Sequence, residues 1–162
     1  MSKPGNVWRR IHGKITKKPT NFSWVIDNNL AGSGIPTSQD EFNWILSNNI
    51  KCVITMTEQA LPGSWTKDIK YLHLPTPDFS PPTLDDINQA VQFIDENIRV
   101  KRPVMVHCAA GLGRAGTILT CYLIAHKGYS AKDAIEKIRN ERPGSIQSES
   151  QEEAIYHYEK AV

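Results

Sequence analysis

A short apolar strand that leads through a loop of small residues into an apolar helix limits the possible folds most. Residues 103–107 form an apolar run, residues 115–127 are apolar on nearly all sides, and mostly Gly and Ala lie between them. A helix that is hydrophobic all round belongs in the interior of a fold. Gly128 follows it and suits a left-handed helix end. This unit is therefore expected at the centre of the molecule.

The other elements alternate around this central unit. Residues 52–57 are rich in β-branched side chains and predict a buried strand, residues 71–74 predict a shorter one, and residues 23–31 predict an edge strand pair. Helices are expected after four capping residues: Ser38, Thr83, Ser130 and Ser148. Glu41 pairs with Ser38 and Asp86 with Thr83, as in a capping box. The order β-α-β-β-α-β-α-α-α predicts a single α/β domain with a central mixed, mostly parallel sheet flanked by helices.

Length and cysteine content narrow the class of protein further. The 162 residues fit one domain. No apolar run reaches the roughly 18 residues of a membrane span, and the first residues lack the apolar stretch of a signal peptide. Three cysteines do not form a disulfide framework, so a reducing, cytoplasmic location is expected. Clusters typical of zinc sites are absent from the sequence.

The charge is distributed unevenly along the chain. Residues 1–20 carry six basic side chains and no acidic one, whereas residues 21–162 carry 13 basic against 17 acidic side chains. We therefore divide the chain into a basic N-terminal extension, 1–20, and a main domain, 21–162. One interpretation of the extension is an arm that is solvated or loosely docked. The other is a segment that binds an anionic partner.

The loop between the central strand and helix has the composition of an oxyanion socket. Its small residues allow successive backbone N–H groups to point into one hollow, and the helix start adds its own unpaired N–H groups. The same surroundings favour a thiolate at Cys108, and the planar fork of Arg114 suits two phosphate oxygens. A thiolate facing a bound phosphate predicts a phosphocysteine intermediate. The expected phosphate-binding residues are Ala109, Ala110, Gly111, Leu112, Gly113 and Arg114.

This loop resembles the H-C-x5-R signature of the protein tyrosine phosphatase superfamily, and residues 22–160 are similar to small, single-domain atypical dual-specificity phosphatases. Further similar stretches are residues 21–25, 30–32, 57–58, 77–79 with 81–82, and 142–146. The resemblance implies a protein phosphatase for phosphotyrosine, with phosphoserine and phosphothreonine left open. It implies no metal or organic cofactor and inhibition by oxyanions such as vanadate. We expect phosphorylated proteins or peptides as partners, a monomer, and no membrane or nucleic-acid partner.

Asp78 is the candidate general acid, because an ester oxygen needs a proton as it leaves phosphorus. Prolines on both sides would make its loop semi-rigid, and it lies 30 residues before Cys108, an interval similar to that of the family. The competing carboxylates Asp85 and Asp86 are interpreted as first-turn residues of the following helix.

Supporting roles are expected for three further residues. His107 is interpreted as a buried support residue rather than as the base for Cys108. Gln147 and Gln151 resemble glutamines that position the hydrolytic water, with helix capping as the alternative. Glu58 is given a peripheral site role, and the remaining cysteines are interpreted as inert core residues.

Ala115 departs from the family pattern, in which a Ser or Thr follows the Arg. That hydroxyl would stabilise the thiolate as it leaves phosphate, so slow hydrolysis of the intermediate is expected here.

Two other functions remain open. Phosphoinositide or RNA 5′-phosphate hydrolysis would fit the basic extension, although the uncharged loop residues argue against it. A slow-turnover phosphoprotein-binding module would fit Ala115, although Cys108, Arg114 and Asp78 are all present.

Overall fold

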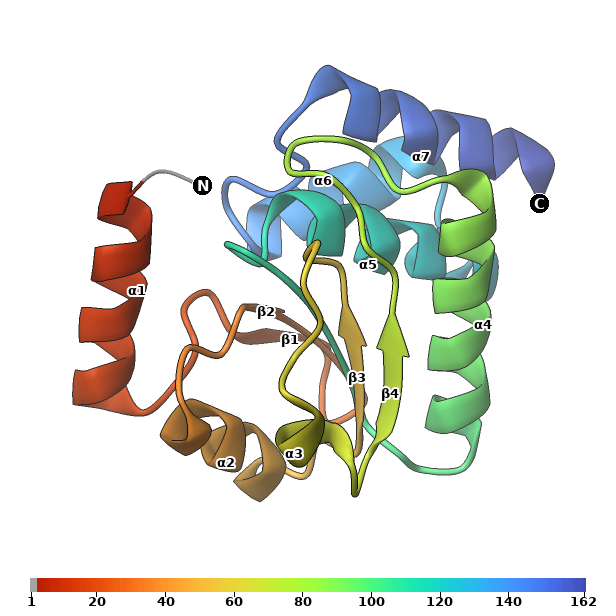
Figure 1. Cartoon of the computed structure of the whole chain (residues 1–162). Coiled ribbons are helices and arrows are strands. Elements are labelled where there is room, and N and C mark those ends of the chain that lie inside the picture. The colour runs from red at the N-terminus through yellow and green to blue at the C-terminus, as the bar shows by residue number, and fades with distance from the viewer. Residues whose placement is uncertain (1–2) are drawn as a thin grey trace.

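The computed structural model describes residues 3–162 as an α/β domain built on a mixed sheet (Figure 1). Within these residues the sheet has five strands in the order β1-β2-β5-β3-β4. β1 pairs antiparallel with β2, and all other pairs are parallel. The strands are β1 Ser23–Ile26, β2 Leu30–Gly34, β3 Cys52–Thr55, β4 Lys70–His73 and β5 Val104–Cys108. The predicted fold class is confirmed.

Helices cover both faces of the sheet (Figure 1). They are α1 Lys3–Thr16, α2 Gln39–Ser47, α3 Gly63–Thr66, α4 Leu84–Arg99, α5 Gly113–Lys127, α6 Ala131–Glu141 and α7 Glu149–Ala161. Side chains alternate along the central strand: Val104 and Val106 join the core under α4 to α7, and Met105 joins the core under α2. This alternation places β5 between two apolar layers, as a central strand requires. No helix in the described part of the chain has the length and apolarity needed to cross a bilayer.

The predicted helix starts are found where the sequence places them. Thr83 and Asp86 form a reciprocal capping box, and the Ser130 and Ser148 hydroxyls accept from backbone N–H groups in their helices. Gly128 ends α5 with a φ of 71°. The capping box predicted at Ser38 is only half present. Ser38 caps α2, but the Glu41 carboxylate accepts instead from the backbone N–H of Thr37, at 2.6 Å.

Some details of the predicted elements differ from the structure. The strand pair predicted within 23–31 is confirmed at one edge of the sheet, where β1 is the outermost strand and β2 extends to Gly34 and pairs with β5 on its other side. The strand predicted over 52–57 ends at Thr55. Two helices, α1 and α3, were not predicted, because a Pro-Gly pair lies at the start of each and both residues disfavour a helix.

Candidate active site

The loop between β5 and α5 turns its carbonyl groups outward. The carbonyl of Ala109 accepts from Ile35 N at 3.2 Å, and that of Ala110 accepts from Asn21 Nδ2 at 2.9 Å. The carbonyls of the next two residues accept from Arg142 Nη2 at 2.6 Å and from Ile146 N at 3.2 Å. Since these four carbonyls are held from outside, the N–H groups of the loop are free to face inward. The hydrogen bonds to these carbonyls therefore explain how the loop forms the predicted anion socket.

Gly111 is needed where the loop crosses β2. Its φ is 78°, in the left-handed region that glycine adopts without strain. A Cβ added there would lie 2.2 Å from the backbone carbon of Ser33 and 2.4 Å from Gly34 N. No side chain fits into this contact, so the loop is seated directly on the neighbouring strand.

Arg142 fixes the loop from below. Its buried guanidinium donates to Gly111 O at 2.6 Å, to Gly32 O at 3.1 Å, and to the hydroxyl of Ser23. Burial lowers the pKa of Arg142 to about 10, which leaves it charged at neutral pH. The sequence analysis noted Arg142 only as part of a similar stretch. The signal that it is structural is an arginine before Pro-Gly, at the end of an amphipathic helix.

Cys108 ends β5 at the floor of the socket. Its Sγ accepts a hydrogen bond from Gly111 N at 3.3 Å, and only 3% of the residue is exposed. The other two cysteines are fully buried in the core. Burial raises the pKa of Cys52 to about 11 and raises the pKa of Cys121 even further. These two thiols therefore stay protonated and inert at neutral pH.

Arg114 lies in the first turn of α5, is 2% exposed, and is held by groups from two loops. Its Nη1 donates to the carbonyl of Thr76 at 2.6 Å and to that of Met56 at 3.3 Å. The same nitrogen contacts Glu58 Oε2 at 3.2 Å, and Nη2 contacts Asp78 Oδ1 at 2.9 Å. The guanidinium is thus fixed in place, and its Nη2 is paired with Asp78, the candidate general acid.

Glu58 connects the arginine to the loop that carries Asp78. One carboxylate oxygen contacts Arg114, and the other accepts from Asp78 N at 3.2 Å. A hydrogen bond from its own backbone and then contact with Arg114 lower the pKa of Glu58. The peripheral role expected from sequence becomes a bridging position in the structure.

The loop that carries Asp78 is also tied to the start of α7. Phe79, whose φ is 61°, accepts through its carbonyl from the Ser148 hydroxyl at 2.8 Å. Gln151 Nε2 donates to Ser80 O at 3.3 Å, while its Oε1 accepts from Gln147 N at 2.8 Å. Gln151 therefore joins the two loops, as well as lying in the first turn of α7. No local pattern of residues indicates the contact between Ser148 and Phe79.

His107 lies inside β5 and is fully buried. Its Nε2 lies 2.7 Å from the Thr55 hydroxyl on β3. Burial is the main cause that lowers the pKa of His107 to about 3. The ring is therefore neutral at physiological pH.

The pKa shift of His107 predicts a loss of stability at mildly acid pH. The unfolded chain takes up the proton near pH 6.5 and the folded chain only near pH 3, so acid favours unfolding between these values. At about 1.4 kcal/mol per pH unit, the loss reaches about 2 kcal/mol at about pH 5. Urea unfolding near pH 7 and near pH 5 measures it. In His107→Asn this part of the pH dependence should vanish, whereas exposed His157→Asn should keep it. Equal losses in wild type and His107→Asn would contradict the prediction.

A cavity of about 160 Å³ collects most of the predicted site residues. It is lined by Gly5, Arg9, Asp78, Phe79, Cys108, Ala109, Ala110, Gly113, Arg114, Gln147 and Gln151. Of the predicted set, His107, Gly111 and Leu112 do not line it. Gly5 and Arg9 come from α1, and sequence reasoning had counted Arg9 only as part of a basic extension.

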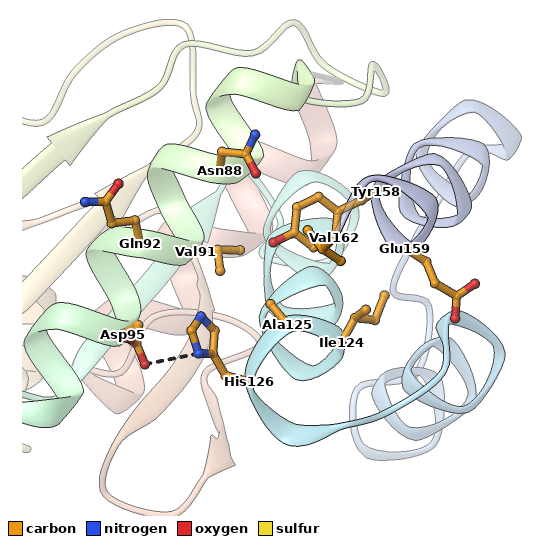
Figure 2. A pocket seen from close by; sticks show the side chains of 10 residues that line it. All are labelled: Asn88, Val91, Gln92, Asp95, Ile124, Ala125, His126, Tyr158, Glu159 and Val162. Carbon is orange, nitrogen blue, oxygen red and sulfur yellow. Dashed lines mark ion pairs between the residues drawn. The ribbon is translucent and has the colours of Figure 1, made fainter.

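A larger cavity of about 610 Å³ lies near the other end of α5, between α4, α5 and α7 (Figure 2). His126 Nδ1 lies 3.2 Å from Asp95 Oδ1 on its wall. Its lining contains no cysteine and no arginine. The nucleophile and the cation that the predicted chemistry needs are therefore found together only in the smaller cavity, among the cavities described here.

Comparisons with known proteins agree with this arrangement. Residues 19–155 match the family described as Swiss Army Knife protein, DSP-PTPase phosphatase domain. The chain is 31% identical to a phosphatidylglycerophosphate phosphatase of Arabidopsis thaliana, over 89% of this chain and 66% of the plant protein. It is 29% identical to phosphatidylglycerophosphatase and protein-tyrosine phosphatase 1 of Mus musculus, over 98% of this chain and 88% of the mouse protein. The crystal structure of Tk-PTP in its active form aligns with a TM-score of 0.80 at 28% identity, covering 88% of this chain and 98% of that one.

The match covers the strands, the socket and the loop of Asp78 together, well over half of the chain. The chain therefore belongs to the family of DSP-PTPase phosphatase domains.

Proposed function

We propose that the protein hydrolyses phosphate monoesters through a phosphocysteine intermediate. One observation carries this proposal: Cys108, Arg114 and Asp78 line a single cavity whose floor is a loop with outward carbonyls. The Cys108 sulfur attacks phosphorus, the bond to the ester oxygen breaks, and Asp78 gives that oxygen its proton. Water then attacks phosphorus, Asp78 takes a proton from the water, the S–P bond breaks, and inorganic phosphate leaves. Arg114 and the loop N–H groups hold the three non-bridging oxygens throughout.

Phosphotyrosine in proteins or peptides is the proposed substrate class. Phe79 lines the cavity next to Asp78 and is 59% exposed, so its ring can contact an aromatic leaving group. The loop side chains at the cavity, Ala109 and Ala110, are uncharged and leave room for such a ring.

A phospholipid monoester is the second candidate, and two observations favour it. The relatives from Arabidopsis and mouse are named for the hydrolysis of phosphatidylglycerophosphate. In addition, Arg9 brings a second guanidinium to the cavity, which suits a headgroup with more than one phosphate.

Comparing kcat/KM for four substrates decides between these classes. The substrates are a phosphotyrosine peptide, the same peptide with phosphoserine, phosphatidylglycerophosphate in detergent micelles, and an RNA with a 5′-phosphate. We expect the phosphotyrosine peptide to be hydrolysed most efficiently. Replacing Phe79 by Leu, which keeps an apolar side chain without a ring, should reduce that efficiency about 3- to 10-fold and leave the lipid rate unchanged. A kcat/KM for the lipid above that for phosphotyrosine would assign the second candidate instead.

Ala115 predicts slow breakdown of the intermediate. It is fully buried at the start of α5, and the hydroxyl of nearby Thr117 donates to Gly113 O at 3.1 Å, so Thr117 does not supply the missing donor. A hydrogen bond to a charged group is worth about 1.5–3 kcal/mol, or roughly one to two decades in rate. Stopped-flow measurements should therefore show a burst of leaving group before a slow steady state. Ala115→Ser should shorten the slow phase by that factor, whereas Thr117→Val should not. If there is no burst and Ala115→Ser is no faster, Ala115 does not slow the breakdown of the intermediate.

A further inference from the structure

Helix α1 exposes an apolar face to the surroundings. Four large apolar side chains of α1 are strongly exposed: Val7 at 56%, Trp8 at 62%, Ile11 at 47% and Ile15 at 78%. Positions 7, 11 and 15 recur every four residues and position 8 lies beside them, so they share one side of the helix. An exposed apolar stripe of this kind is unusual on a free surface and indicates an interaction site.

The opposite side of α1 contacts the catalytic domain. Gly13 is buried against the Glu41 side chain, where an added Cβ would lie 1.4 Å from a carboxylate oxygen. Arg9 and Gly5 line the cavity of Cys108. The helix is therefore seated through its glycines and Arg9, and its apolar stripe faces away from that contact.

Cations accompany the apolar stripe. The side chains of Arg10, Lys14 and Lys17 are exposed, and residues 1–20 contain no acidic side chain. Lys18 differs from them, because its Nζ lies over the rings of Phe22 and Trp44. The rest of the chain carries more acidic than basic side chains, so this surface attracts anions against the overall charge of the domain.

We propose that this α1 face, defined as Val7, Trp8, Ile11 and Ile15 with the flanking cations, docks on the surface of an anionic lipid bilayer. An apolar stripe containing Trp, bordered by Lys and Arg, is the composition of a helix that lies in a membrane interface. The cations complement the negative charge of the headgroups. The 14 residues of α1 extend about 21 Å along the axis and carry several charges, so the helix lies on the bilayer rather than across it. The absence of a segment long enough to span a bilayer does not argue against this proposal, because an interfacial helix does not cross the membrane. The proposal therefore departs from the expectation that the chain has no membrane partner.

Docking would hold the active site close to the membrane surface. Val7, Trp8 and Ile11 of α1 belong to the α1 face, whereas Gly5 and Arg9 of the same helix line the cavity on its opposite side. The cavity of Cys108 would then lie about one helix diameter, ~10 Å, from the bilayer rather than against it. Access to phosphate esters near the membrane rests on the proposed function, and the docking itself does not.

Vesicle flotation with the full chain tests the proposal. Wild type is compared on phosphatidylcholine vesicles and on vesicles with about 30% phosphatidylglycerol, where we expect at least tenfold stronger binding. A variant with Trp8→Ser, Ile11→Ser and Ile15→Ser tests the stripe, and one with Arg10→Gln, Lys14→Gln and Lys17→Gln tests the cations. Each should reduce binding on the order of tenfold or more. Trp8, the most exposed tryptophan, should shift its emission to the blue in wild type with anionic vesicles.

Matched controls remove the same chemistry elsewhere. Lys101→Gln, Lys127→Gln and Lys132→Gln delete three exposed cations outside α1, and Val100→Ser with Tyr156→Ser removes exposed apolar side chains. These variants should bind like wild type. Hydrolysis of a small soluble aryl phosphate should be unchanged in all of them, so failure of the docking and failure of the catalytic proposal give different results. Equal binding to neutral and anionic vesicles, undiminished binding of the α1 variants, or self-association that the Ser variant abolishes would each overturn the proposal.

Discussion

Replacing Cys108 by Ser is expected to lower kcat on the order of 10⁴-fold or more, while a phosphotyrosine peptide still binds. The serine hydroxyl is not ionised at neutral pH and is a poor nucleophile toward phosphorus. Binding survives because it depends on the loop N–H groups and on Arg114, which Glu58 and the Thr76 carbonyl continue to hold. Steady-state kinetics and a fluorescence binding assay with the peptide measure the two effects separately.

A second readout identifies the intermediate in the same experiment. Acid quenching of wild type with substrate should trap a phosphate adduct on the peptide that contains Cys108, and the Ser variant should show none. Cys121→Ala is the matched control, because this thiol is fully buried in α5 and does not line the cavity of Cys108. It should keep both activity and adduct. Activity above about 1% of wild type in the Ser variant would exclude the sulfur as nucleophile.

Replacing Asp78 by Ala should separate catalysis from binding. Loss of the acid is expected to reduce kcat for the phosphotyrosine peptide by about 10²- to 10⁴-fold. The loss should shrink for aryl phosphates with strongly acidic leaving groups, which depart without a proton. Affinity should rise at the same time, because the Asp78 carboxylate lies 2.9 Å from Arg114 and competes with phosphate for that cation.

The control for this variant is Asp85→Ala. Asp85 is an exposed residue in the first turn of α4, and it was the competing candidate in the sequence. It should change neither kcat nor affinity. A rate loss that is the same for every leaving group, or one that Asp85→Ala reproduces, would remove Asp78 from the role of acid.

Local patterns predicted the centre of the molecule well. The β-branched strand, the glycine-rich loop and the helix that ends at Gly128 each follow from residues adjacent in sequence, and the structure places them as expected. The predicted cluster of Cys108 and Arg114 is equally local. Asp78 could be placed with them because prolines flank its loop and because its interval of 30 residues before Cys108 resembles that of the family.

Contacts between distant segments could not be predicted in this way. Arg142 contacts Gly111, and Ser148 contacts Phe79, through pairs that no local periodicity connects. The two bonds of Glu58 depend on the position of its loop relative to α5. Helix α1 was not predicted for a different reason: Pro4 and Gly5 lie in its first turn, and its large apolar side chains are exposed, so it is not anchored to the core by an apolar face.

The outward hydrogen bonds of the loop carbonyls determine whether the loop can bind an oxyanion outside this domain. Their donors come from positions 21, 35, 142 and 146, so nearly the whole length of the polypeptide shapes eleven consecutive residues from His107 to Thr117. A peptide with this stretch alone, or a foreign scaffold that received it as a graft, would lack those donors and would not hold an oxyanion. The unit that can be transferred between proteins is the entire domain.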